Sequence, residues 1–296
     1  MSAKVFEALI LAGYNFVALI AQEDKEVGRK KIKTPVPTKI IANKYHIPVY
    51  QPHRIRLDYE FAKELKPDLI LTFAYGQIIP QALLDIPRLG AFNLHGSLLP
   101  KYRGAAPIQR AIINGEDKTG VTLMEMVDKM DAGKMFAKEE VLISSDDNYS
   151  SLSEKIVNAA IKVFKDNIDD VIAGINKGIK QDESQVTFAN KITPEEEHLN
   201  IDLDAKQQVD FIRALSYSPG AYLILNEEKI KIYQAKIYQS KASDDIGLIS
   251  IINHHLLYQA KDALIELISL KPQGKKVMTG FDYYNGHKDI INKHFQ

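Results

Sequence analysis

The sequence predicts an open, doubly wound, mostly parallel α/β sheet followed by a small C-terminal β-barrel domain. Over residues 1–175, short apolar runs alternate with segments of helical periodicity, which is the pattern of parallel βαβ units. Beyond residue 193, short β-prone runs lie between turn signals, as in small antiparallel barrels. Residues 176–192 are polar, and we predict that they link a first domain at 1–175 to a second at 193–296.

Hydrophobic periodicity and turn residues assign the individual elements. The first domain is predicted to have helices at 3–12, 36–45, 57–66, 78–84, 106–114 and 151–175, and strands at 15–21, 47–50, 68–73, 90–94, 120–126 and 135–142. The second is predicted to have a helix at 205–215 and strands at 221–225, 229–237, 247–252 and 263–270. The polar, basic stretch 22–33 is predicted to be an exposed and mobile loop.

Composition narrows the class of protein. Apolar residues make up 45% of the chain and charged residues 26%, which is typical of a soluble globular protein. The absence of cysteine excludes disulfides, thiol nucleophiles and cysteine-ligated metals. No apolar run is long enough to cross a bilayer and the N-terminus has no signal-peptide layout, so we expect a cytoplasmic protein without a membrane partner.

The segment GAFNLHGSLLPKYRGAAPIQ, residues 90–109, carries the clearest chemical signal. Alternation along a strand places Asn93 and His95 on the same side, at its carboxyl end. An amide N–H can stabilise a developing oxyanion, and an imidazole can exchange a proton near neutral pH. The alternative is a strand that ends in two polar residues bonded to nearby backbone groups, and the spacing alone does not choose between the two.

A second polar residue, Asp131, follows the predicted strand at 120–126 and precedes Ala132 and Gly133. An aspartate before a glycine is most often part of a turn. Beside a histidine, however, it could tune the imidazole or relay a proton through a water molecule.

The run NLHGSLLPKYRGAAPIQ, with MDAG at 130–133, resembles the formyltransferases that use 10-formyltetrahydrofolate. The resemblance implies that Asn93, His95 and Asp131 form the catalytic group, and that 10-formyltetrahydrofolate is the formyl donor, with no metal. It also implies an OB-like C-terminal barrel. The implied folate-binding residues are Ser97, Leu98, Leu99 and Pro100 in one loop and Ala74, Tyr75 and Gly76 in another.

Within this family the sequence is most similar to the members that formylate the amino group of methionyl initiator tRNA. GAAPIQ at 104–109 and LKPQGKKVM at 270–278 carry that similarity. The implied tRNA-binding residues are Arg29, Lys30, Lys31, Lys33, Lys271, Lys275 and Lys276. Basic runs are usually solvated surface, and the whole chain has as many acidic as basic residues, 38 of each, so RNA binding would require local patches. We expect a monomer.

The alternatives are a formyltransferase acting on a sugar amine, a formylfolate hydrolase, and a catalytically weak folate- or tRNA-binding protein. The last is suggested by a departure from the family, because this sequence begins with the helix at 3–12, whereas relatives have a central strand before it. Without that strand, the strands at 15–21 and 68–73 would either pair directly or border an unfilled slot. Unpaired buried backbone groups cost ~1–3 kcal/mol each. We therefore expect the reading frame to begin upstream and the chain by itself to be unstable.

Overall fold

The computed structural model describes residues 1–28 and 31–296 and divides them into two compact units. Unit 1 comprises residues 1–107, 119–142 and 153–189, and unit 2 comprises residues 108–118, 143–152 and 190–296. In the described part of the chain, no helix has both the length and the apolar character needed to cross a membrane.

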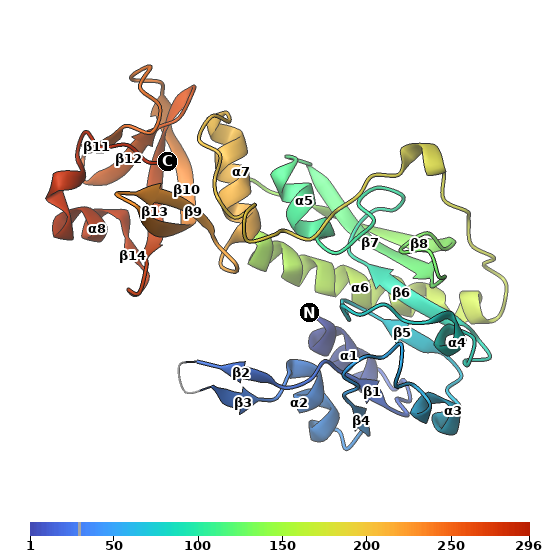
Figure 1. Ribbon diagram of the computed structural model, residues 1–296. Coiled ribbons are helices and arrows are strands. Elements are labelled where there is room, and N and C mark those ends of the chain that lie inside the picture. The colour runs from blue at the N-terminus through green and yellow to red at the C-terminus, as the bar shows by residue number, and fades with distance from the viewer. Residues whose placement is uncertain (29–30) are drawn as a thin grey trace. The chain divides into compact units, whose positions relative to one another are not determined.

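The helices expected in the first half of the chain are present (Figure 1). Their apolar positions recur every three to four residues, as Val5 and Leu9 do in the first helix, and this places one face in the core. They are α1 (Ser2–Leu11), α2 (Pro37–Lys44), α3 (Phe61–Leu65), α4 (Gln81–Leu84), α5 (Pro107–Ile113) and α6 (Tyr149–Ile172).

The strands of unit 1 form three separate sheets rather than one. A four-stranded sheet has the order β5 (Ile70–Thr72), β6 (Ala91–His95), β7 (Lys118–Glu125) and β8 (Met135–Leu142). In it β5 and β6 are parallel, and β6 and β7 are antiparallel. The second sheet is the parallel pair of β1 (Leu19–Ile20) and β4 (Val49–Tyr50), and the third is a short antiparallel hairpin after β1. The predicted α/β fold class is confirmed, and the four-stranded sheet is mixed, with a parallel and an antiparallel pairing.

An apolar cavity of about 470 Å³ separates β1 from β5. Of the two arrangements expected without a preceding strand, direct pairing or a slot, the structure therefore shows the slot. Its walls include Phe6 and Leu9 of α1 and Phe164 of α6. Side chains bridge the slot at the carboxyl ends of the strands, where Gln22 Nε2 donates to the Tyr75 carbonyl at 2.7 Å. Both strands therefore run in the same direction along the slot.

The stretch after β1 differs from the prediction of an irregular loop. It contains a β-hairpin of β2 (Lys25–Val27) and β3 (Ile32–Thr34), which extends outward from β1 and α2 (Figure 1). Gly28 makes the hairpin turn possible because its φ of +74° lies in the left-handed region. The sequence did not predict these two strands, because neither has the alternation of apolar and polar residues that marks a half-buried strand. Arg29 and Lys30 lie outside the described residues.

Unit 2 is built around an antiparallel sheet with the order β11 (Ile249–Ile252), β12 (His255–Gln259), β13 (Ala263–Pro272), β10 (Glu228–Ser240) and β9 (Ala221–Leu225), with β14 (Met278–Thr279) paired to β13. Helix α7 (Ala205–Leu215) packs against β10, and α8 (Gly280–Gly286) packs against β13. The core includes Leu223, Ile265 and Tyr258. Strands β12 and β14 and helix α8 were not predicted from the sequence.

The strand pairing of unit 2 does not by itself close into the predicted barrel, because β11 and β9 are not paired with each other. Residues 293–296 lie along both of these edge strands. Gln296 exchanges two backbone hydrogen bonds with Ile224 of β9, and the Phe295 N–H donates to the Gly247 carbonyl just before β11. The C-terminal segment thus covers the polar edges that the sheet would otherwise expose.

Candidate active site

Asn93 lies in the middle strand of the three that carry the site, with its backbone paired to Thr72 of β5 and Met124 of β7. Its side chain is half-buried, and its Oδ1 accepts a hydrogen bond of 2.8 Å from the Thr72 hydroxyl. In this arrangement the Thr72 hydroxyl is the donor and the amide oxygen of Asn93 is the acceptor, so the bond engages only the oxygen of the amide. Among the described residues no acceptor is bonded to Asn93 Nδ2, so this N–H₂ group is available to a ligand.

His95 is buried at the carboxyl end of β6, and each of its ring nitrogens faces a protein oxygen. Nε2 lies 2.8 Å from the Tyr102 carbonyl oxygen, and Nδ1 lies 3.6 Å from Asp131 Oδ2. A carbonyl oxygen only accepts hydrogen bonds, so Nε2 must carry the proton. In the neutral ring Nδ1 is therefore the basic nitrogen, and protonation there would place a positive charge directly against the Asp131 carboxylate.

Asp131 is held by contacts to both its backbone and its carboxylate. Its φ of +49° is in the left-handed region, which is uncommon for a residue other than glycine. Its Oδ2 accepts from the Gly104 N–H at 2.9 Å. Gly133 ends the same turn, and a Cβ there would lie 2.0 Å from the Glu125 carbonyl oxygen, so the turn requires glycine. The structure thus brings His95 and Asp131 together.

The loop that follows β6, residues 96–106, is fixed by internal hydrogen bonds. The buried Ser97 hydroxyl donates to the Lys101 carbonyl at 2.7 Å, and the Ser97 carbonyl accepts from Thr122 at 2.7 Å. The Leu99 N–H donates to the same threonine hydroxyl at 3.1 Å. Ser97 therefore orders the loop, and no described base activates its hydroxyl as a nucleophile.

Residues 181–189, here called the return segment, form hydrogen bonds with both loops of the site. The Arg103 N–H donates to the Thr187 carbonyl at 2.9 Å, and the Ala189 N–H donates to the Arg103 carbonyl at 2.7 Å. Gly104 allows this close approach, since a Cβ there would lie 2.7 Å from the Ala189 carbonyl oxygen. The sequence predicted only a linker here, because the polar residues of the segment have no periodicity that would indicate packing against a sheet.

Arg103 is the most deeply buried charged residue of this region, with 1% of its surface exposed. Its guanidinium donates to Glu183 at 2.7 Å and to Gln181 at 3.0 Å. Lys129 also donates to Glu183, at 2.9 Å. The hydrogen bonds from Arg103 and then Lys129 lower the pKa of Glu183 to about 2.

Two family profiles match almost the whole chain. One is described as formyl transferase and matches residues 3–168; the other is described as formyl transferase, C-terminal domain, and matches residues 191–288. The chain belongs to the formyltransferase family.

Curated relatives of this family member are similar over nearly their full length. A methionyl-tRNA formyltransferase of Staphylococcus epidermidis is 40% identical over 293 residues, which cover 98% of this chain and 94% of the relative. One of Lactobacillus acidophilus is 39% identical over 288 residues, covering 96% and 92%.

Solved structures share the fold at lower identity. The methionyl-tRNA formyltransferase of Clostridium thermocellum aligns with a TM-score of 0.52 and 19% identity, covering 76% of this chain and 91% of that one. WlaRD, a sugar 3N-formyl transferase, aligns with a TM-score of 0.65 and 18% identity, covering 93% and 94%. At these identities the likeness shows the fold alone.

In this formyltransferase, the loop after β5 lines the slot through Ala74 and Tyr75. Ala74 and Gly76 both have left-handed φ values, +50° and +80°, which turn the chain sharply around Tyr75. The Tyr75 hydroxyl is buried and has no hydrogen-bond partner among the described residues. Burial raises the pKa of Tyr75 to about 12, so the phenol remains neutral at physiological pH.

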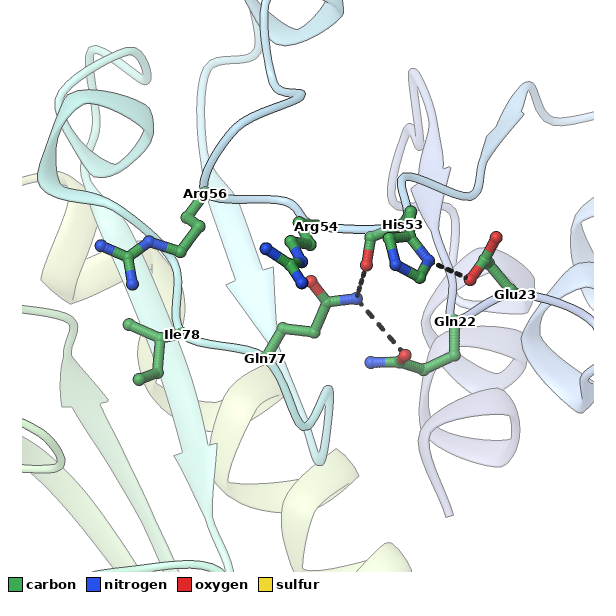
Figure 2. A pocket seen from close by; sticks show the side chains of 7 residues that line it. All are labelled: Gln22, Glu23, His53, Arg54, Arg56, Gln77 and Ile78. Carbon is green, nitrogen blue, oxygen red and sulfur yellow. Dashed lines mark hydrogen bonds and ion pairs between the residues drawn. The ribbon is translucent and has the colours of Figure 1, made fainter.

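A basic hollow of about 470 Å³ adjoins this loop and was not predicted from the sequence (Figure 2). Arg54 and Arg56 come from the loop after β4, and in the described part of the chain neither guanidinium forms an ion pair with a carboxylate (Figure 2). The Gln77 side chain accepts from the Ile55 N–H at 2.9 Å and so joins this loop to the one after β5. The hollow is lined by Gln22, Glu23, His53, Arg54, Arg56, Gln77 and Ile78.

The predicted tRNA-binding lysines occupy separate places. Lys33 is exposed on β3, and Lys31 is exposed in the hairpin turn. In unit 2, Lys271 is half-buried on β13, while Lys275 and Lys276 are exposed in the turn between β13 and β14. Arg29 and Lys30 lie outside the described residues, so their prediction rests on the sequence.

Proposed function

We propose that this chain transfers the formyl group of 10-formyltetrahydrofolate to the amino group of methionyl initiator tRNA. The observation that carries the proposal is the arrangement at the carboxyl end of β6, where the Asn93 amide is free to donate and the His95 ring lies between the Tyr102 carbonyl and Asp131. The near full-length similarity to curated methionyl-tRNA formyltransferases supports the choice of donor and acceptor.

The proposed reaction is a direct acyl transfer. The neutral methionyl nitrogen attacks the formyl carbon, and a tetrahedral intermediate with a negatively charged oxygen forms. Asn93 Nδ2 donates to that oxygen, and the protonated His95 ring stabilises it electrostatically. A proton then moves from the attacking nitrogen toward N10 of the folate, assisted by Asp131, and the bond between the formyl carbon and N10 breaks.

The two loops named by the resemblance are proposed to hold the donor. Ser97, Leu98, Leu99 and Pro100 follow directly after the strand of Asn93 and His95, and Ala74, Tyr75 and Gly76 follow the parallel neighbour β5. Both loops therefore start from the carboxyl ends of adjacent parallel strands, which is where open α/β sheets bind ligands. No metal is proposed, because the formyl carbon of the donor is already electrophilic.

The acceptor tRNA is proposed to contact Arg29, Lys30, Lys31 and Lys33 in one unit and Lys271, Lys275 and Lys276 in the other. Lysine and arginine bind the RNA backbone chiefly through phosphate, so such binding should weaken as salt concentration rises. We further propose that the protein acts as a cytosolic monomer, which size-exclusion chromatography at working concentration can test.

The decisive experiment is an in vitro formylation assay with initiator tRNA charged with methionine and 10-formyltetrahydrofolate as donor. Formyl-methionyl-tRNA is the expected product. Parallel reactions with a nucleotide-linked amino sugar, and with no acceptor, test the sugar formyltransferase and hydrolase alternatives. Binding of tRNA or folate without turnover in any reaction would instead indicate a binding protein and overturn the proposal.

A further inference from the structure

Both the amide nitrogen and the amide oxygen of the Gln181 side chain form hydrogen bonds with the two loops of the active site. Its Nε2 donates to the carbonyl oxygens of Asp131 at 2.7 Å and of Gly133 at 2.8 Å. Its Oε1 accepts from Arg103 Nε at 3.0 Å. One half-buried amide thus connects the loop that carries Asp131 to the loop that carries Arg103.

These two loops also supply the partners of His95. The Tyr102 carbonyl, which accepts from His95 Nε2, directly precedes Arg103 in the chain. Asp131, which faces His95 Nδ1, is held at its own backbone carbonyl by Gln181. The distance of 3.6 Å between His95 and Asp131 therefore depends on a bond network that passes through residue 181.

The backbone of Asp131 needs such support because its left-handed φ of +49° is unfavourable for an aspartate. The two carbonyls that flank this turn point toward the Gln181 amide and have their hydrogen bonds satisfied there. If the amide were removed, the turn could relax toward an ordinary conformation. The carboxylate would then move away from the imidazole.

Only a glutamine satisfies all three partners at this position. Two carbonyl oxygens require two N–H donors, and the arginine requires an acceptor. Glutamate has the same length and could still pair with Arg103, but when ionised it has no donor and would place negative charge against both carbonyls. Asparagine offers the same groups but is one methylene shorter.

We propose that Gln181 is the positioning residue that holds Asp131 against His95 during formyl transfer. The inference rests on the proposed function, since it concerns the proton transfer assigned to these two side chains. Gln181 does not touch the reacting atoms, so its effect should appear in the turnover step and not in the binding of either substrate. A displacement of about 1 Å in a catalytic group can cost about 10²-fold in rate.

The test compares Gln181→Glu and Gln181→Ala with the wild-type protein in steady-state formylation assays. Both variants should lose about 10- to 100-fold in kcat, with KM for the tRNA and for the folate within about twofold of wild type. The loss in kcat of Gln181→Glu relative to wild type should become smaller as the pH falls toward the usual titration range of glutamate, about pH 4–5, because the protonated carboxyl regains one donor. The deficit of Gln181→Ala should not change in that way.

Gln185 provides a matched control on the same return segment. Its Nε2 donates to Asp182 Oδ2 at 3.1 Å, and among the described residues its side chain forms no hydrogen bond with either loop of the site. Gln185→Glu and Gln185→Ala should keep wild-type kcat and pH dependence. Thermal unfolding of all four variants, with assays run well below each melting temperature, separates loss of positioning from loss of folded protein.

The outcomes distinguish this inference from the proposed function. If the wild-type protein forms no formyl-methionyl-tRNA, the proposed function fails, and the variants are not needed to show it. If the wild type is active and folded Gln181→Glu and Gln181→Ala match it in kcat and pH dependence, only the positioning role of Gln181 is overturned. A change in KM with no change in kcat would also overturn the positioning role of Gln181.

Discussion

Two regions of unit 1 differ in how their polar groups are satisfied. Around the end of β6, the side chains of Asn93, His95 and Asp131 each have a hydrogen-bond or ion-pair partner in the protein. The return segment, about fifty to eighty residues farther along the chain, supplies hydrogen-bond partners to the backbone of the two site loops. Between β1 and β5, two strand edges face an apolar cavity, and the Tyr75 hydroxyl is buried with no partner in the described part of the chain.

This difference indicates that unit 1 is more rigid around the end of β6 than around the slot between β1 and β5. A site that stabilises developing charge works best when its donors are held in place before the reaction, and the loops around His95 meet that requirement. The slot lacks both packing and backbone hydrogen bonds, which are the features that resist local opening. We therefore expect β1, β4 and the attached hairpin to open more readily than the β5–β8 sheet.

The largest predicted effect concerns the site at the end of β6, where the polar groups have hydrogen-bond partners. Asn93→Ala should lower kcat about 10²- to 10³-fold, the scale of losing one oxyanion donor, with little change in melting temperature because the side chain is half-buried. Thr72→Val, which removes the hydrogen bond to the amide oxygen, should have a smaller effect in the same direction. Formylation kinetics and thermal unfolding of both variants are the measurements. Wild-type turnover by Asn93→Ala would remove this residue from the proposed mechanism.

The second prediction concerns the slot. Extending the chain before Met1 by a turn and a strand of about four apolar residues should raise the melting temperature by about 5–10 °C, since each buried apolar side chain contributes about 1.5–3 kcal/mol before the entropy of ordering is subtracted. Activity should rise with it. Scanning calorimetry of the two proteins measures the shift.

An extension of equal length with alternating proline and serine is the control for the slot, because proline cannot donate to a strand ladder. It should leave the melting temperature unchanged. If the chain without any extension already unfolds cooperatively at a high temperature and is fully active, the slot is not a weak point, and the comparison between the two regions fails.

The third prediction extends the comparison to the hairpin beside the slot. Lys33 is the predicted tRNA-binding residue that lies on β3 of this hairpin, where it is exposed. Lys33→Glu should raise KM for the tRNA several-fold and lower the slope of log affinity against log salt by about 1, as expected when one phosphate contact is lost. Lys63→Glu on α3 is the control and should behave like wild type. An unchanged salt slope would exclude the hairpin from tRNA binding.

The smallest predicted effect concerns the return segment and depends on pH. Hydrogen bonds from Arg103 and Lys129 hold the pKa of Glu183 at about 2, below its ordinary value of 4.5. The ionised carboxylate therefore stabilises the fold above about pH 4.5, and that stabilisation is lost as the pH falls toward 2. Wild type should melt above Glu183→Gln at pH 7, and the difference should vanish near pH 2. A difference that is constant with pH would assign the effect to packing.

Turn chemistry explains why some elements escaped sequence-based prediction. Strands β11 and β12 are joined at Asn253 and His254, which both have left-handed φ values, +48° and +68°. Such tight hairpin turns favour asparagine followed by glycine. Because histidine stands in the second position here, the sequence did not indicate a hairpin turn. The hairpin of β2 and β3 was missed for a different reason, because its residues are polar on both faces.

The sequence by itself determined most of the helices and strands, the family, the placement of Asn93 and His95 at the carboxyl end of β6, and that of Asp131 in the loop after β7. These follow from local periodicity, turn residues and a long uninterrupted motif. Only the tertiary structure decided that the Tyr102 carbonyl fixes the proton of His95, that Gln181 supports Asp131, and that a cavity lies between β1 and β5. Each of these depends on which distant segments meet, and hydrogen bonds between single side chains and remote carbonyls leave no periodic pattern in a sequence.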